Sequence, residues 1–97
     1  MIVKRQYLKT KPVCKVTFQV AAKAKHVALV GEFIGWYEAS TPMKKTKEGA
    51  FAVSLELESG REYQYRYLLD GSKWVNDENA DKSVLTPFGN ENSVIVL

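Results

Sequence analysis

The sequence predicts an all-β fold, a sandwich or barrel of short strands in a single domain, from three observations. Several stretches alternate between hydrophobic and polar residues, which is the period of a half-buried strand. Turn-forming residues separate these stretches about every ten residues, the usual spacing in sandwiches and barrels. No window of the sequence carries the hydrophobic stripe of an amphipathic helix. A small nucleic-acid-type β-barrel is the runner-up architecture.

The N-terminal half of the chain predicts two clear strands and a third at its start. The first clear strand covers residues 14–20, where every second residue is hydrophobic. We expect a short helical or looped connection at 21–25, followed by a short apolar strand at 26–30. Hydrophobic residues between Ile2 and Tyr7 indicate an extra strand ahead of these.

The C-terminal half predicts three further strands. Alternating stretches at 51–57 and 63–69 are separated by Ser59-Gly60, which predicts a tight hairpin. Asp70-Gly71 predicts a second short turn, because both residues tolerate a positive φ. The apolar tail at 93–97 predicts the last strand.

The composition is that of an ordinary globular domain. The 97 residues suffice for one hydrophobic core, and 45% of them are hydrophobic. The single cysteine, Cys14, excludes an internal disulfide bond, lies on the hydrophobic side of its strand and fits a cytoplasmic protein. No apolar run reaches the length of a signal peptide or a membrane span, so we expect no membrane partner.

The net charge of +3 is spread along the chain. A small cluster at Lys44, Lys45 and Lys47 lies between Pro42 and Gly49, and we interpret it as a solvated turn. Nucleic-acid-binding proteins gather basic residues on one face, so we expect no nucleic-acid partner. The competing hypothesis, binding of a single-stranded nucleic acid through the aromatic residues, predicts strong salt dependence.

The strand at 63–69 and the turn after it bring candidate binding residues together. Its tyrosines share one side and are expected in the core, which leaves Gln64 and Arg66 on the opposite side. The turn then returns Trp74 to the end of this strand. If Trp36 lies on the same side, two indole rings and a guanidinium share one surface.

Indole rings and a guanidinium on one surface suit a sugar ligand. The C–H faces of a pyranose ring stack on aromatic rings, while arginine and asparagine offer hydrogen bonds to its hydroxyls. Asn90 and Asn92 stand two apart in an expected extended segment, so we expect them to point the same way. Phe88 shares their parity and adds an apolar edge. Two separate stacking rings imply a ligand of several linked sugar units.

Six short motifs along the chain carry a family resemblance. They are Val30-Gly31-Glu32-Phe33 followed by Trp36; Pro42-Met43; Gly49 with Phe51; Gly60 with Tyr63-Gln64-Tyr65-Arg66-Tyr67; Asp70-Gly71 followed by Trp74 and Asp77; and Phe88-Gly89-Asn90-Glu91-Asn92-Ser93. In this order and spacing they resemble the carbohydrate-binding module of family 48. That family includes the glycogen-binding domain of the AMP-activated protein kinase beta subunit and the N-terminal early-set domains of isoamylases and glycogen branching enzymes. The resemblance runs from about Val27 to Val96.

The resemblance implies an immunoglobulin-like (early-set) β-sandwich that binds α-1,4-linked glucans such as glycogen, starch or malto-oligosaccharides. It implies stacking of the glucan on Trp36 and Trp74. It also implies that Phe88 inserts beside the glucan and that sugar hydroxyls are contacted by Arg66, Asn90 and Asn92. Arg66 takes the place of a basic residue that is usually lysine in the kinase domains.

Two positions depart from the family pattern, since Glu32 replaces a usual aspartate and Ile34 replaces a common asparagine. We expect no enzyme activity, because nothing places two carboxylates across a cleft as glycoside hydrolysis requires. We also expect no metal or other cofactor, because His26 is the one histidine and is expected to be structural or solvent-facing. The alternative function is a protein-interaction domain that docks on a glucan-processing enzyme of glycoside hydrolase family 13.

Overall fold

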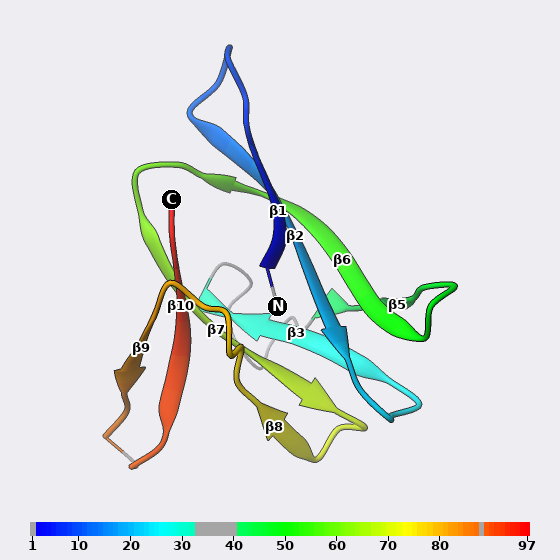
Figure 1. Ribbon diagram of the computed structural model, residues 1–97. Coiled ribbons are helices and arrows are strands. Elements are labelled where there is room, and N and C mark those ends of the chain that lie inside the picture. Colours follow the sequence, from blue (N-terminus) through cyan, green and yellow to red (C-terminus); the bar gives the residue numbers. More distant parts are fainter. Residues whose placement is uncertain (1, 33–40, 88) are drawn as a thin grey trace.

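Two antiparallel β-sheets pack face to face in the computed structural model, which describes residues 2–32, 41–87 and 89–97 (Figure 1). The strands are β1 (Ile2–Tyr7), β2 (Val13–Ala21), β3 (Val27–Gly31), β4 (Thr41–Pro42), β5 (Lys44–Lys45), β6 (Ala50–Glu58), β7 (Glu62–Leu69), β8 (Lys73–Val75), β9 (Lys82–Leu85) and β10 (Glu91–Val96). Within these three ranges, no helix has the length and apolar character that crossing a membrane requires.

The two sheets are separate, so the fold is a sandwich and not a closed barrel. One sheet has four strands in the order β1-β2-β6-β5, and β2 pairs with β6 along its whole length. The other has six strands in the order β4-β3-β7-β10-β9, with β8 paired to the far end of β7. This arrangement confirms the predicted all-β sandwich.

The core lies between the sheets and is built by the residues that the alternation predicted. Cys14, Val16 and Phe18 of β2 are fully buried, and they face Tyr65 and Tyr67 of β7, which are fully buried as well. The rings of Phe18 and Tyr65 meet edge to face, with centroids 5.1 Å apart. Because every second residue of β7 is committed to this core, the residues between them face away from it.

A buried carboxylate anchors the connection between β8 and β9 to the inner side of β7. Asp77 accepts hydrogen bonds from the hydroxyls of Tyr65 (2.7 Å) and Tyr67 (3.3 Å), and its own N–H donates to Ser93 Oγ (2.7 Å). Burial, and then the neighbouring carboxylate, raises the pKa of both phenols, so they remain protonated donors. The network joins β7, β10 and the segment after β8.

The two turns next to β7 have the predicted geometry. Gly60 and Gly71 have φ values of 79° and 71°, and Asp70 is a non-glycine residue with a φ of 50°. Asp70 Oδ1 accepts the backbone N–H groups of Lys25 and His26, each at 2.9 Å. The turn that precedes Trp74 is therefore tied to the β2–β3 loop.

The short strands β4, β5, β8 and β9 were not expected from the pattern. Lys44 and Lys45, interpreted from sequence as part of a turn, form β5 and pair with Ala52 and Phe51. They are exposed, as expected, and so is Lys47 in the following turn. The connection between β2 and β3 is a loop without a helical turn. Strands of two to four residues leave too short a pattern to recognise, because pairing of the backbone and not side-chain alternation defines them.

Candidate functional site

The side of the six-stranded sheet that faces away from the core gathers the candidate residues, and we call it the outer face. The tyrosines of β7 point inward, so Gln64 and Arg66 lie on the outer face. The strand register adds Trp74, which pairs with Leu68, and Asn92, which neighbours the inward-facing Ser93. Strands β7, β8 and β10 thus supply one surface.

Arg66 and Trp74 form a cation–π pair on the outer face. The guanidinium carbon of Arg66 lies 4.7 Å from the centroid of the Trp74 ring, and both residues are half-buried. Arg66 Nε is buried and has no hydrogen-bond partner among the described residues. The prediction that the Asp70-Gly71 turn returns Trp74 to the end of the 63–69 strand is confirmed, since Trp74 pairs with Leu68.

Asn92 lies beside this pair with an acceptor unused. The residue is 7% exposed, and its Nδ2 donates to Gln64 Oε1 at 3.0 Å. Its Oδ1 is buried and finds no hydrogen-bond partner in the described part of the chain. Buried side-chain polar atoms are normally paired, and the two unpaired ones, Asn92 Oδ1 and Arg66 Nε, both belong to residues of the outer face.

Glu32, which follows β3, holds the part of β7 that carries Gln64. Strand β3 ends at Gly31, which pairs with Tyr65. Glu32 Oε1 then accepts the backbone N–H of Gln64 at 2.7 Å, in place of a further strand residue. The sequence marks Glu32 as a departure from the family pattern, and the structure shows its role in holding the strand that carries Gln64 and Arg66.

Asn90 lies in the turn before β10, whereas Asn92 lies within the strand. The Thr86 hydroxyl donates to Asn90 Oδ1, and the Thr86 N–H donates to the Asn90 carbonyl at 2.7 Å. Asn90 is exposed, while Asn92 is buried. The extended segment that was expected to hold both residues therefore begins one residue later, at Glu91.

Trp36 and Phe88 lie outside the described residues. That two tryptophans share one surface therefore remains a prediction. Two contacts of the site were not predicted from the sequence. They are the hydrogen bond between Asn92 and Gln64 and the hydrogen bond from the Gln64 N–H to Glu32. The position of Gln64 two residues before Arg66 in the same strand places both side chains on one side of the sheet, and this spacing could have indicated Gln64 as a residue of the site.

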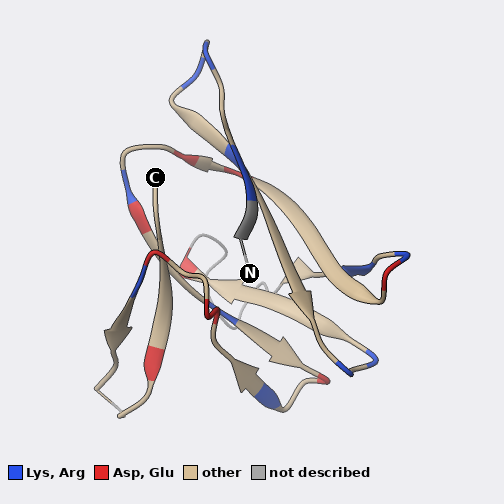
Figure 2. Cartoon of the chain, viewed as in Figure 1, with Lys and Arg blue, Asp and Glu red and all other residues tan. Residues whose placement is uncertain are grey.

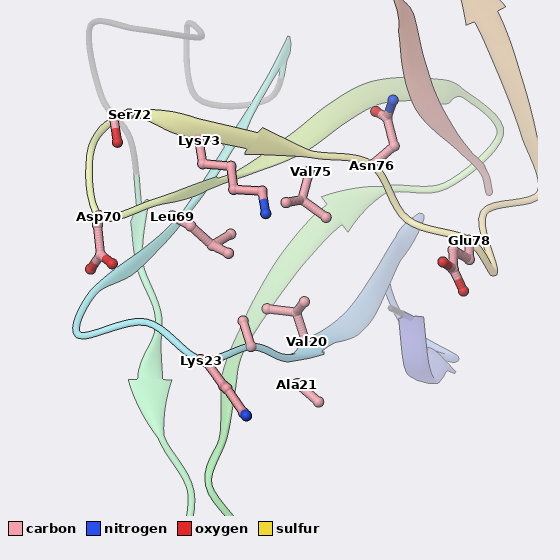
Figure 3. A pocket seen from close by; sticks show the side chains of 11 residues that line it. Val20, Ala21, Lys23, Leu69, Asp70, Ser72, Lys73, Val75, Asn76 and Glu78 are labelled. Carbon is pink, nitrogen blue, oxygen red and sulfur yellow. The ribbon is translucent and has the colours of Figure 1, made fainter.

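A groove of about 550 Å³ opens at the end of the sandwich, below the β7–β8 turn. In Figure 3 the apolar side chains of Val20, Leu69 and Val75 point toward one another, with Lys73 beside them. Lys73 and Val75 flank Trp74 and have the opposite parity, and Trp74 is not among the lining residues. The groove and the outer face are thus separate features.

Lysine and arginine residues and aspartate and glutamate residues are spread along the described strands and loops of the chain (Figure 2). Lys82 pairs with Glu62, and Arg61 pairs with Glu58 at 3.4 Å. Nucleic-acid-binding surfaces concentrate basic residues on one face.

Comparison with known proteins identifies the family of this chain. A model of the family described as the glycogen recognition site of AMP-activated protein kinase matches residues 14–96, starting in β2 and thus ahead of Val27, where the sequence resemblance begins. Protein PTST homolog 2, chloroplastic, from Arabidopsis thaliana is 34% identical over 74 residues, which are 76% of this chain and 13% of that protein. This chain therefore spans a small part of that relative. Because the family model covers most of the chain, the chain belongs to the family of the glycogen recognition site of AMP-activated protein kinase.

Proposed function

We propose that this chain is a non-catalytic module that binds α-1,4-linked glucan on the outer face. The observation that carries the proposal is the stack of Arg66 on Trp74 on the same side of the sheet as the Asn92 amide. An aromatic ring with polar side chains on the same side of the sheet provides what a sugar ring requires, namely an apolar platform and directional partners. Membership of a glycogen-recognition family supports the choice of an α-glucan.

The glucan stacks on Trp74, and its hydroxyls bond Arg66 and Asn92. Stacking removes apolar area from water and contributes about 25 cal/mol per Å². The ion–ring pair holds the indole in one orientation before the sugar arrives, which reduces the ordering cost of binding. Trp36, Phe88 and Asn90 extend the contact to further sugar units in this proposal. A few stacks and hydrogen bonds correspond to about −4 to −7 kcal/mol, a dissociation constant between about one millimolar and about ten micromolar.

Titration with maltoheptaose tests the proposal directly. Tryptophan fluorescence and NMR shifts of the Trp74, Arg66 and Asn92 side chains are followed, with the β-linked cellohexaose as the ligand control. Trp74→Ala should weaken binding by about 1–3 kcal/mol, as at other ring-stacking sites. Lys15→Ala, an exposed change on the opposite sheet, should leave the affinity unchanged.

The absence of any response to several millimolar maltoheptaose would overturn the proposal. An equal response to cellohexaose would leave sugar binding intact but exclude preference for the α-1,4 linkage. Unchanged affinity in a folded Trp74→Ala variant would place the glucan elsewhere on the molecule.

A further inference from the structure

Three residues join the N-terminal strand to the six-stranded sheet, and we call this group the clamp. Arg5 Nη2 of β1 donates to Asp81 Oδ1 at 2.7 Å, and Arg5 Nη1 donates to the Val96 carbonyl at 3.2 Å. Asp81 Oδ2 accepts the Val96 N–H at 2.7 Å. The clamp therefore uses both carboxylate oxygens of Asp81 and both backbone polar groups of Val96.

The clamp lies where the end of β10 meets the start of β9. The Asp81 N–H donates to the Val94 carbonyl at 3.0 Å, immediately before β9 begins at Lys82. Side-chain exposure of Arg5 and Asp81 is 29% each, so their charges are partly shielded from water. Charge-assisted hydrogen bonds in such a setting are shorter and stronger than neutral ones. The start of β9 and the end of β10 are thus fastened together and to the opposite sheet.

The same strand carries a residue of the outer face. Asn92 lies four residues before Val96 on β10, about 13 Å along a strand at 3.3 Å per residue. A strand that shifts in register turns its side chains to the other face, so the position of the Asn92 amide against Gln64 depends on the register of β10. The clamp adds to the backbone pairing of β10 with β7 and β9 in holding that register.

We propose that Arg5 and Asp81 are positioning residues for the glucan site, acting through β10 on the Asn92 amide. The glucan part of this inference rests on the proposed function. Arg5 precedes residue 14, where the family model begins, so the clamp adds a residue from outside the matched region. The N-terminal strand is in this way part of the binding apparatus although it lies on the other sheet.

The experiment compares Arg5→Gln, Asp81→Asn and Arg5→Lys in the 97-residue chain. Lys4→Gln is the matched control, because it makes the same charge change one residue away on an exposed side chain. Asp81→Asn keeps an oxygen acceptor for the Val96 N–H but removes the carboxylate that holds Arg5. Each variant is titrated with maltoheptaose at a temperature at which it is fully folded, and the NMR signals of the Asn92 and Gln64 side-chain amides are recorded without ligand.

We expect Arg5→Gln and Asp81→Asn to bind maltoheptaose about 2- to 10-fold more weakly and to shift the Asn92 amide signal. Arg5→Lys should restore most of the affinity, and Lys4→Gln should match the parent chain in both measurements. Should Arg5→Gln fail to fold, Asp81→Asn carries the same comparison.

The inference would be overturned if folded Arg5→Gln or Asp81→Asn binds maltoheptaose as tightly as the parent chain and its Asn92 amide signal does not shift. If the parent chain itself does not bind maltoheptaose, the proposed function fails, and the Asn92 signal still decides whether the clamp positions this side chain. A shifted Asn92 signal supports positioning, and an unshifted one excludes it.

Discussion

Arg66 lies on the outer face with its guanidinium against Trp74 and its Nε shielded from solvent. A guanidinium is planar and weakly hydrated, so it stacks on an indole in a way that an ammonium group does not. The stack restrains two side chains that otherwise lose rotamer freedom when a ligand binds. The family resemblance implies a basic residue here, usually lysine, and the arginine of this chain adds the planar contact.

Arg66→Lys keeps the charge but loses the planar stack, so we expect a loss of about 0.5–1 kcal/mol in maltoheptaose binding. The measurement is the dissociation constant together with the NMR signals of the Trp74 ring. Arg61→Lys is a matched control, because Arg61 stacks on Tyr63 at 5.2 Å on another part of the molecule. Equal effects of the two substitutions would show that the Arg66 stack has no special role in binding.

At the scale of elements, the outer face depends on strands that end at different points. Strand β7 continues past the end of β3, and the Glu32 side chain accepts the Gln64 N–H that β3 leaves behind. An unpaired N–H at this position would loosen the backbone just before Arg66. The Glu32 carboxylate thus continues the hydrogen bonding along β7 by one residue beyond Tyr65, toward the N-terminal end of the strand.

Glu32→Ala should accelerate hydrogen exchange at the Gln64 amide and lower the free energy of unfolding by about 0.5–1.5 kcal/mol. Glu32→Gln retains an oxygen acceptor, so we expect a much smaller effect on exchange. Amide exchange followed by NMR measures both, with Glu56→Ala on β6 as a control for loss of an exposed carboxylate. Unchanged exchange at Gln64 in Glu32→Ala would contradict the role of this side chain.

At the scale of the whole molecule, carboxylates tie together segments that are distant in sequence. Asp70 joins the β7–β8 turn to the β2–β3 loop, and Asp81 joins β1, β9 and β10. The hydrogen bond from the His26 N–H lowers the pKa of Asp70, and the hydrogen bond from Arg5 lowers the pKa of Asp81. Folding therefore favours the ionised form of both groups.

This linkage predicts loss of stability in acid. A carboxylate with a lowered pKa in the folded state stabilises the fold above its unfolded pKa of about 3.9, and that contribution disappears as the pH falls through the folded value. The midpoint temperature of thermal unfolding should decrease as the pH is lowered from about 5 to about 2. This decrease should be smaller in Asp70→Asn and in Asp81→Asn, because each variant lacks one of the two carboxylates. Circular dichroism measures the midpoint at each pH. If the midpoint depends on pH equally in the parent chain and in both variants, Asp70 and Asp81 do not cause the loss of stability in acid.

The scattered charge predicts how binding responds to salt. Maltoheptaose is neutral, so its dissociation constant should change less than about twofold between about 0.05 M and about 0.5 M sodium chloride. A single-stranded nucleic acid bound through lysines would instead lose affinity steeply over this range. Parallel titrations with maltoheptaose and a single-stranded oligonucleotide distinguish these outcomes, and a steep salt dependence for maltoheptaose would contradict a neutral-ligand site.

The parts of the fold that could be predicted from sequence are those with a local pattern. The burial of Cys14 and Phe18, the inward tyrosines of β7 and the turn at Asp70-Gly71 follow from alternation and from residues that tolerate a positive φ. The short strand β8 has no such pattern, since its three residues are defined by pairing with β7. Within the described site, Trp74 was predicted to return to the end of β7 because one turn separates the two strands.

The sequence by itself determined the β class, the face of each long strand that enters the core, and the return of Trp74 to the end of β7. These features arise from interactions between residues close in the chain, where alternation and turn chemistry act directly. The tertiary structure decided the contact of Asn92 with Gln64, the Glu32 hydrogen bond to β7, and the clamp between Arg5 and Asp81. Each of these depends on which distant strands become neighbours and in which register, and no local pattern specifies that pairing.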